Sequence, residues 1–266
     1  IVVTHCQDPT APADRRRGRQ QAPRSSLVAV RGDTGEVLWK KSTGGIRHLL
    51  VAIDAGRVLF LSNRKLNCLT LEGGELLWQV DPPKPQGRTL IAHAGVVLLY
   101  APKTLAAWDA DTGQALWRHS RVPSSSGSES PDLFVANDIV WRGMVPIDED
   151  QQPVGKSADA MAVGFDLRSG KEVRRVVVHR LRSPEHHHRC YRNKATDRYI
   201  ISGMEGAEFM DLDGDTSCQN NWLRGACKLG IMPCNGLLYV PPDQCFCQPG
   251  AKLLGFLAVA ADAPAR

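Results

Sequence analysis

The chain has 266 residues, of which 42% are hydrophobic, 23% are charged and 6% are aromatic. This balance can supply a buried core, and it excludes a wholly disordered or collagen-like chain. The net charge is +5, and no apolar run reaches the roughly 18 residues of a membrane-spanning helix, since the longest candidate, Leu253 to Ala261, has about half that length.

Residues 1–26 are predicted to form a basic linker, or the end of a preceding segment. They contain five arginines and two aspartates, and therefore +3 of the net charge. Such a cluster can bind nucleic acid or an anionic membrane surface, but these arginines stand among Pro, Gly, Gln and Ser, without aromatic residues that stack on bases. We therefore expect a solvated segment and no nucleic-acid partner.

A repeat with a period of 39 residues follows the linker. Three copies place a glycine in a turn and a tryptophan four residues later, and two of them carry Asp-Thr before the glycine. The shared landmarks are Asp33, Gly35, Trp39, Gly74, Trp78, Asp111, Gly113 and Trp117. Three matches at one period indicate a repeat architecture rather than coincidence.

The chemistry of the Asp-Thr-Gly turn is structural. Asp and Thr side chains cap backbone donors in a tight turn, and glycine adopts the positive φ that the reversal needs. The tryptophan then lies on the next strand, where we expect it to pack between sheets. The alanine before two of the turns, Ala29 or Ala107, is replaced by Cys68 in the middle copy, so Cys68 is predicted to be a core residue.

Hairpin signals divide each repeat into short strands. The signals are Ala55-Gly56, Ala94-Gly95, Asn137-Asp138, Asp197-Arg198 and Asn235-Gly236. An extra stretch near residues 121–156 predicts a loop insertion. Later copies of the turn, around Gly170, Gly214 and Asp262, match the pattern less well.

Four-stranded units of about 40 residues predict an all-β fold, a β-propeller, over residues 27–266. About five units can be counted, some of them incomplete, which is few for a ring of this class. Because an open segment would leave sheet edges exposed, we expect closure by flanking strands, by oligomerisation or by sequence outside this chain.

The repeat of Ala, Asp, Gly and Trp resembles the tryptophan-docking repeat of quinoprotein propellers. That family comprises the pyrroloquinoline quinone (PQQ) dehydrogenases and non-enzymatic relatives, among them the scaffold lipoprotein of the outer-membrane β-barrel assembly machine. The later part, with Cys190, Cys227 and Cys245-Phe246-Cys247, resembles large PQQ-like propeller proteins of planctomycete-type bacteria. This second resemblance implies that an upstream methyltransferase-type domain can be attached.

The resemblance does not carry a PQQ site over to this sequence. PQQ alcohol dehydrogenases use a disulfide between adjacent cysteines, a stacking tryptophan at the ring centre, and Glu, Asn and Asp around a calcium ion. No cysteines are adjacent here, because Phe246 separates Cys245 from Cys247. We therefore assign no catalytic or cofactor-binding residue.

Six of the eight cysteines fall in the last 77 residues. They are the disulfide candidates Cys190, Cys218, Cys227, Cys234, Cys245 and Cys247. Disulfides would indicate an oxidising compartment, so a periplasmic or secreted bacterial protein is expected. The sequence does not decide which cysteines pair.

A second hypothesis makes part of this segment a metal site. Its candidate ligands are His186, His187, His188, Cys190, Cys245 and Cys247. Zinc and copper accept imidazole and thiolate together, but the spacings match no established zinc pattern, and a solvated loop explains the histidines as well. Close by, Arg192-Asn193-Lys194 suits the rim of an anion-binding site, and the polarity of a strand end explains it equally well.

Every strong motif explains sheet packing and none explains chemistry. The favoured hypothesis is therefore a non-catalytic or substrate-presenting module without a cofactor, which binds a protein partner or a flanking domain. The first alternative is an oxidoreductase, either one that uses PQQ with calcium or a metal-assisted one that uses copper or zinc. The second is the propeller portion of a larger enzyme with a methyltransferase-type domain.

Overall fold

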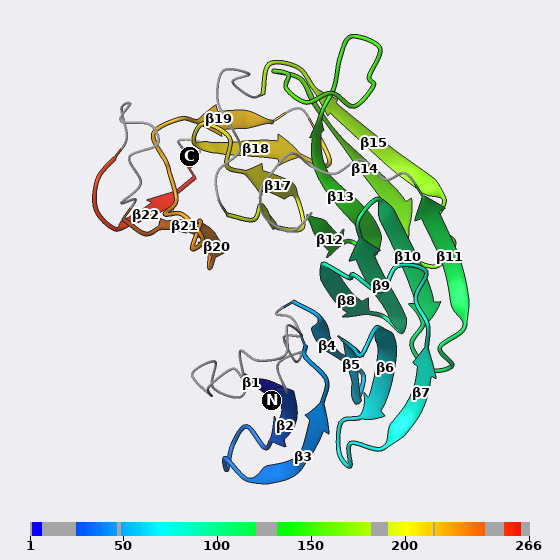
Figure 1. Ribbon diagram of the computed structural model, residues 1–266. Coiled ribbons are helices and arrows are strands. Elements are labelled where there is room, and N and C mark those ends of the chain that lie inside the picture. The colour runs from blue at the N-terminus through cyan, green and yellow to red at the C-terminus, as the bar shows by residue number, and fades with distance from the viewer. Residues whose placement is uncertain are drawn as a thin grey trace, which may run out of the picture. The chain divides into compact units, whose positions relative to one another are not determined.

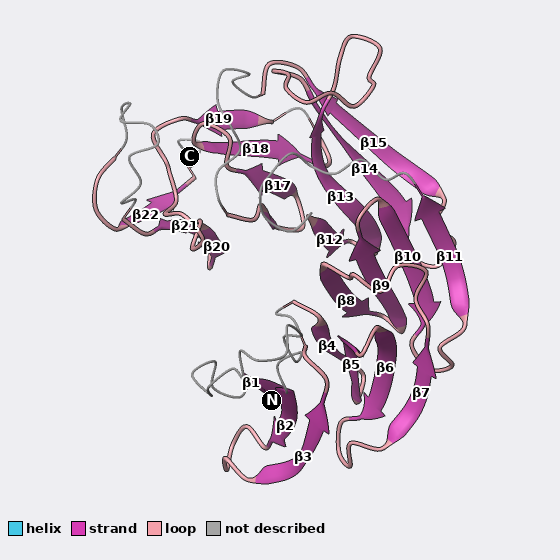
Figure 2. Cartoon of the chain, viewed as in Figure 1, coloured by secondary structure: helices cyan, strands magenta, loops and turns pink. Residues whose placement is uncertain are grey.

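The computed structural model describes residues 2–6, 25–46, 49–120, 132–181, 191–214, 216–242 and 253–261. Within these ranges every regular element is a β-strand (Figure 1), and Figure 2 shows the strands joined by loops. The described residues accordingly contain no helix that could cross a membrane. The chain divides into two compact units, Ile1–Val122 and Pro123–Arg266, and each is described by itself.

The first unit contains three antiparallel sheets, with strands in the orders β1-β2-β3, β4-β5-β6-β7 and β8-β9-β10-β11. The strands are β1 (Val2–Cys6), β2 (Ser25–Val30), β3 (Val37–Thr43), β4 (Val51–Asp54), β5 (Arg57–Ser62), β6 (Lys65–Thr70), β7 (Leu76–Val80), β8 (Thr89–His93), β9 (Val96–Ala101), β10 (Thr104–Asp109) and β11 (Ala115–Ser120). Within each sheet every strand pairs with its neighbour in the sequence. The first strands of the second and third sheets, β4 and β8, lie against each other.

The second unit also contains three antiparallel sheets, β12-β13-β14-β15, β16-β17-β18-β19 and β20-β21-β22. The strands are β12 (Leu133–Ala136), β13 (Ile139–Pro146), β14 (Ala160–Asp166), β15 (Glu172–Val178), β16 (Lys194–Ala195), β17 (Tyr199–Ser202), β18 (Ala207–Asp211), β19 (Cys218–Asn220), β20 (Met232–Cys234), β21 (Leu237–Val240) and β22 (Leu257–Ala260). The described residues thus form six sheets, where the sequence predicts about five, because β20–β22 make a sheet of their own.

Two predicted segments have different bounds in the structure. Residues 2–6 of the predicted linker belong to the first sheet, since β1 pairs with β2 and sets Val2 opposite Ala29. Residues 7–24 lie outside the described residues. Strands β12 and β13 occupy much of the predicted insertion near 121–156, so that the long connection in the described part is residues 147–159, between β13 and β14.

Four of the predicted hairpin turns have positive φ at both central residues, as type I′ turns require. They are Ala55-Gly56, Ala94-Gly95, Asn137-Asp138 and Asn235-Gly236. The turn at Asp197-Arg198 is built differently, because the Thr196 hydroxyl accepts hydrogen bonds from the backbone N–H groups of Arg198 and Tyr199. Side-chain hydrogen bonds stabilise this turn, whereas the other turns use the positive φ that glycine and asparagine adopt readily.

The middle strands of each sheet are the most deeply buried. In the first unit, Leu59, Leu66 and Cys68 are inaccessible to solvent and pack with Val97 and Leu99. Cys68 is therefore a core residue, as predicted, and burial raises the pKa of its thiol to about 11.

Glu208 on β18 is a fully buried carboxylate that holds the β17–β18 turn together. One of its oxygens accepts hydrogen bonds from the Ser202 hydroxyl at 2.5 Å and the Met204 N–H at 2.8 Å. The other accepts from the N–H groups of Glu205 at 2.9 Å and Gly206 at 3.1 Å. These four donors replace the water that a buried carboxylate loses, so the turn depends on one side chain.

Asp211, at the end of β18, is also shielded from solvent. It accepts hydrogen bonds from Arg198 Nη2 at 3.0 Å, from the Asp213 N–H at 3.0 Å and from the Thr216 hydroxyl. Burial alone would raise the pKa of the Asp211 carboxyl, but the hydrogen bonds outweigh burial and hold that pKa well below its usual range.

The stability of the second unit is therefore expected to depend on the ionised form of Asp211. Because its folded pKa lies below the unfolded value of about 3.9, the carboxylate stabilises the fold above that pH, and the contribution is lost as the pH falls below it. Asp211→Asn should lower the melting temperature at neutral pH, and the difference from the wild type should shrink as the pH falls from about 4 to about 2 in circular dichroism melts. A difference that stays constant over this range would contradict the assignment.

Candidate functional site

Two of the repeat tryptophans, Trp39 and Trp78, lie at the contacts between successive sheets of the first unit. Trp78 on β7 donates a hydrogen bond from Nε1 to the carbonyl of Ala110 at 2.9 Å, and its ring covers Gly113, where a Cβ would lie 2.8 Å from the indole. Trp39 on β3 donates in the same way to Leu71 at 2.8 Å. The turn glycines Gly35, Gly74 and Gly113 have φ of 74°, 68° and 72°, the left-handed conformation predicted for them.

The capping residue differs between repeats. Asp33 accepts a hydrogen bond from the N–H of the next residue, as predicted. Asp111 does not cap its own turn, because Asp109 accepts the turn N–H groups there, and Asp111 instead pairs with Arg57 on β5. Trp117 packs against the histidine two residues later, with 5.2 Å between ring centroids. All of these contacts serve packing or turn formation.

Six of the predicted disulfide and metal candidates lie outside the described residues. They are His186, His187, His188, Cys190, Cys245 and Cys247. No disulfide joins two cysteines of the described ranges, so the predicted pairing is not found among Cys218, Cys227 and Cys234; Cys218 lies on β19 and Cys234 on β20, which belong to different sheets. Within the same ranges no group of three His, Cys, Asp or Glu residues could hold a metal.

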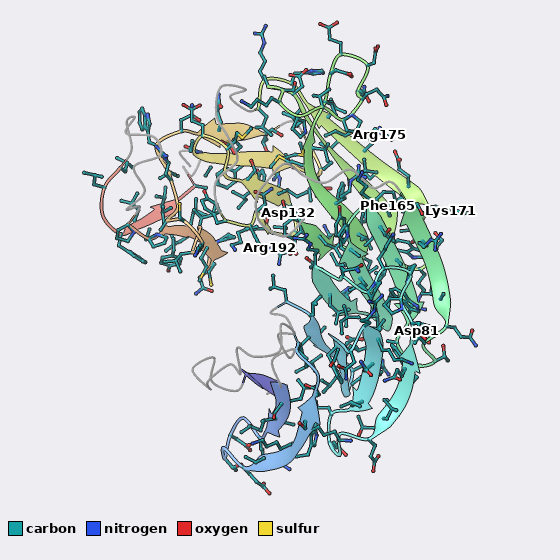
Figure 3. All side chains as sticks on the ribbon, viewed as in Figure 1. Asp81, Asp132, Phe165, Lys171, Arg175 and Arg192 are labelled. Carbon is teal, nitrogen blue, oxygen red and sulfur yellow. The ribbon has the colours of Figure 1, made fainter. Side chains whose placement is uncertain are left out.

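The predicted polar triplet lies at the start of β16, and the fold brings it to Asp132 at the start of β12 (Figure 3). Asn193 donates from Nδ2 to Asp132 Oδ2 at 2.6 Å, and both residues are buried. Gly143 makes room for the carboxylate, since a Cβ at that position would lie 2.7 Å from Asp132 Oδ2. This arrangement is not evident from the sequence, because Asp132 and Asn193 are 61 residues apart.

The charge of this cluster favours an anion. Burial lowers the pKa of both Arg192 and Lys194, and the neighbouring Arg192 lowers that of Lys194 further, while Asp132 acts in the opposite direction on both. Described residues thus supply two cations and one carboxylate, and the carboxylate also binds Asn193. A carboxylate or phosphate group would relieve the repulsion between the two cations.

The side chains of this cluster decide whether it suits the PQQ and calcium of the dehydrogenases. Calcium takes oxygen ligands, but Asn193 turns its amide nitrogen towards Asp132, and the two cations weaken the attraction of that carboxylate for a metal ion. Arg192 and Lys194 suit the carboxylates of an organic anion. The residues therefore fit an anionic ligand and do not fit the calcium ion.

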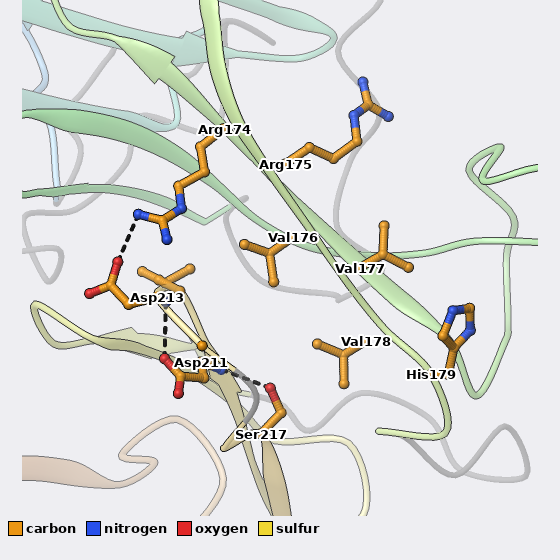
Figure 4. Close-up of a pocket in the computed structure, with 11 residues that line it drawn as sticks. Arg174, Arg175, Val176, Val177, Val178, His179, Asp211, Asp213 and Ser217 are labelled. Atoms are coloured by element: carbon orange, nitrogen blue, oxygen red, sulfur yellow. Dashed lines mark hydrogen bonds and ion pairs between the residues drawn. The ribbon is translucent and has the colours of Figure 1, made fainter.

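A pocket of about 440 Å³ lies between β15 and the turn after β18 (Figure 4). Val176 and Val178 line its apolar side and pack with Leu212 in one hydrophobic cluster. At its polar end Arg174 Nη1 and Asp213 Oδ1 form an ion pair at 2.7 Å. The pocket is wide enough for a single ring or side chain.

An exposed apolar surface lies on the last sheet and on the segment before it. We call it the Trp222 surface, and it consists of Trp222, Met232, Leu253, Leu254 and Phe256, which are each 50% to 78% exposed. These residues come from adjoining segments, since the Leu253 N–H donates to the Trp222 carbonyl at 3.1 Å and the Phe256 ring lies 6.2 Å from that of Tyr239, the cross-strand partner of Met232. Exposed apolar side chains that gather in one region mark interaction sites in soluble proteins.

Comparison with solved structures identifies the class of protein. BamB from Moraxella catarrhalis is similar with a TM-score of 0.54 and 14% identity, over 90% of this chain and 69% of that chain. Kluyveromyces lactis Hsv2 has a TM-score of 0.54 and 11% identity, over 84% and 68%. A europium-containing methanol dehydrogenase has a TM-score of 0.50 and 10% identity, and this chain spans only 60% of its length. The fold is therefore a β-propeller.

The sequence itself assigns the family. A family profile described as outer membrane protein assembly factor BamB matches residues 23–196, well over half of the chain, while no curated protein matches the sequence. The chain belongs to this family of PQQ-like repeat propellers. The predicted family and fold class are both confirmed.

Proposed function

We propose that the chain is a non-catalytic binding module, which recognises a protein partner or a flanking domain in a periplasmic or secreted protein. The observation that carries the proposal is the Trp222 surface, where two aromatic and three aliphatic side chains are exposed together. Aromatic residues dominate the energetics of protein interfaces, because they bury a large area with little loss of conformational freedom. The family description, an assembly factor, is consistent with work done through protein contacts.

The other strong features of the sequence contribute to packing between and within the sheets. Trp39 and Trp78 bind the turns of neighbouring sheets, and Asp111 pairs with Arg57. We therefore expect the function to depend on surfaces formed by residues outside the repeat motif. The Trp222 surface is one of them.

Recovery of partners from the native cells tests the proposal. The full-length protein is cross-linked and purified as wild type, as Trp222→Ser/Phe256→Ser and as Val37→Ser/Leu76→Ser. The last pair removes side chains that are each 58% exposed on β3 and β7 and is the matched control. We expect a protein that is enriched with the wild type and the control, and at least tenfold depleted with the first variant, as loss of two interface aromatics predicts. Equal recovery with all three forms, or no enriched protein with any, would overturn the proposal.

One observation favours a second candidate function, that of an oxidoreductase. Arg192 and Lys194 form a partly buried cationic pair that could bind the carboxylates of an anionic quinone. The likeness to the methanol dehydrogenase concerns the fold alone. This second candidate requires quinone binding that depends on the two cations.

A further inference from the structure

The pocket beside β15 occupies a place that a tryptophan fills elsewhere in this chain. In the first unit the acceptor of each indole is the carbonyl that follows β6 or β10, namely Leu71 or Ala110. The N–H groups of these residues donate to Gly56 and Gly95 at 2.7 Å and 2.9 Å. Leu212 follows β18 and makes the same backbone bond, to the carbonyl of Arg198 at 2.7 Å, so Leu212 is the equivalent acceptor.

The side chain that should fill the slot is an arginine. Trp39 and Trp78 each stand four residues after a turn glycine, and Arg174 stands four residues after Gly170. Arg174 turns to the ion pair with Asp213 and leaves the pocket of about 440 Å³ beside it (Figure 4). The equivalent position in the second unit therefore has the backbone acceptor of a tryptophan site without its indole.

One side of the slot is apolar and suits an aromatic ring. Val176 and Val178 supply an apolar side next to Leu212. Gly214 also lines the pocket, and a Cβ placed on it would have only Asp211 Oδ2 at 3.5 Å and Arg198 Nη2 at 4.0 Å as near neighbours, so this residue leaves room beside the slot. The Arg174 guanidinium at the edge can lie over a π face, an attractive arrangement.

We infer that this slot binds a tryptophan side chain of a partner polypeptide, with the indole N–H donated to the carbonyl of Leu212. The inference rests on the proposed function, because it gives a protein partner a defined anchor residue. The two occupied slots of the first unit show the geometry that the bound indole would reproduce, with N···O distances of 2.8 Å and 2.9 Å.

Methyl-detected NMR of the full chain tests the inference. The probe is a short tryptophan-containing peptide, compared with the same peptide carrying alanine, and the signals are the methyl groups of Val176 and Val178. We expect saturable shifts of these methyls with the tryptophan peptide only. Absence of shifts, or equal shifts with the alanine peptide, would overturn the inference.

Variants locate the binding. Arg174→Trp fills the slot from within and should abolish the shifts, as should Val176→Phe, which serves if the first variant does not fold. Arg31→Ala is the matched control, since Arg31 also has an exposed carboxylate partner, Glu36 at 3.4 Å, but does not line the pocket, and it should bind like the wild type. Binding that survives both blocking variants would contradict the inference.

The two sets of experiments distinguish a failure of this inference from a failure of the proposed function. If the Trp222 surface proves dispensable in cells but the peptide shifts persist and Arg174→Trp removes them, the slot stands and the proposed surface fails. If the methyl signals shift on concentrating the protein alone, and Trp222→Ser removes that effect, the occupant is a second copy of this chain, and the inference of a separate partner is wrong.

Discussion

Gly113→Ala is expected to lower the free energy of unfolding by about 3 kcal/mol, from left-handed strain together with overpacking. Gly113 has φ of +72°, and a Cβ there would lie 2.8 Å from the Trp78 ring, so the indole must leave its site and lose its hydrogen bond to Ala110. Both the backbone and the contact between sheets are affected. Denaturant unfolding of the full chain, followed by circular dichroism, measures the change.

Gly35→Ala is the matched control for this prediction. Gly35 has nearly the same φ, +74°, in the same kind of turn, but nothing lies within 4 Å of a Cβ placed on it. Only the strain of about 1 to 2 kcal/mol should remain. The difference between the two variants therefore isolates the tryptophan contact, and equal destabilisation would show that the indole contributes nothing at Gly113.

Glu208→Ala should destabilise the second unit by about 4 kcal/mol, because it leaves several buried donors without an acceptor. The donors are the Ser202 hydroxyl and the N–H groups of Met204, Glu205 and Gly206. Glu208→Gln keeps one carbonyl oxygen but turns an NH₂ group towards donors, so about half of that loss is expected. Thermal and denaturant unfolding measure both variants.

The control for Glu208 is Glu36→Gln. Glu36 pairs with Arg31 at 3.4 Å, and its side chain is 65% exposed, so the change should stay within about 0.5 kcal/mol. Glu36 is far from the β17–β18 turn in the sequence. The Glu36→Gln variant therefore tests the effect of removing a charge alone. A Glu208→Ala protein as stable as Glu36→Gln would refute the role assigned to the buried carboxylate.

The repeat could be predicted from the sequence because its chemistry is local. A turn glycine and a tryptophan four residues later, as in Gly74 and Trp78, fix both a backbone conformation and the side chain that packs on the next sheet. The strand hairpins follow from dipeptides such as Asn235-Gly236 for the same reason. Fold class and family are therefore readable without any long-range information.

The polar groups of the second unit could not be predicted in this way. Glu208 and Asp211 resemble ordinary charged residues of a strand, and only the turns around them bring the donors that make their burial possible. Asp132 meets Asn193 across 61 residues. Asp111 was expected to cap its turn, but Arg57 on another strand attracts it, and Asp109 takes over the cap.

The sequence carries one signal for the pocket beside β15. Aligning Gly170 with the earlier turn glycines places Arg174 at the tryptophan position, and a polar residue there predicts a site that the repeat leaves unfilled. The exposed side chains of the Trp222 surface had no comparable signal, because Leu254 and Phe256 look like core residues of a strand until β22 is seen to begin at Leu257.

The most direct test of the central claim, that this propeller binds rather than oxidises, is an absorbance titration of the purified full-length protein with PQQ and calcium, run with a dye-linked assay of alcohol oxidation. The binding-module account predicts no saturable one-to-one quinone complex and no dye reduction above that of the free cofactor. Stoichiometric binding with turnover, lost in Lys194→Gln, would contradict the account and establish the cationic cluster at β16 as a quinone site.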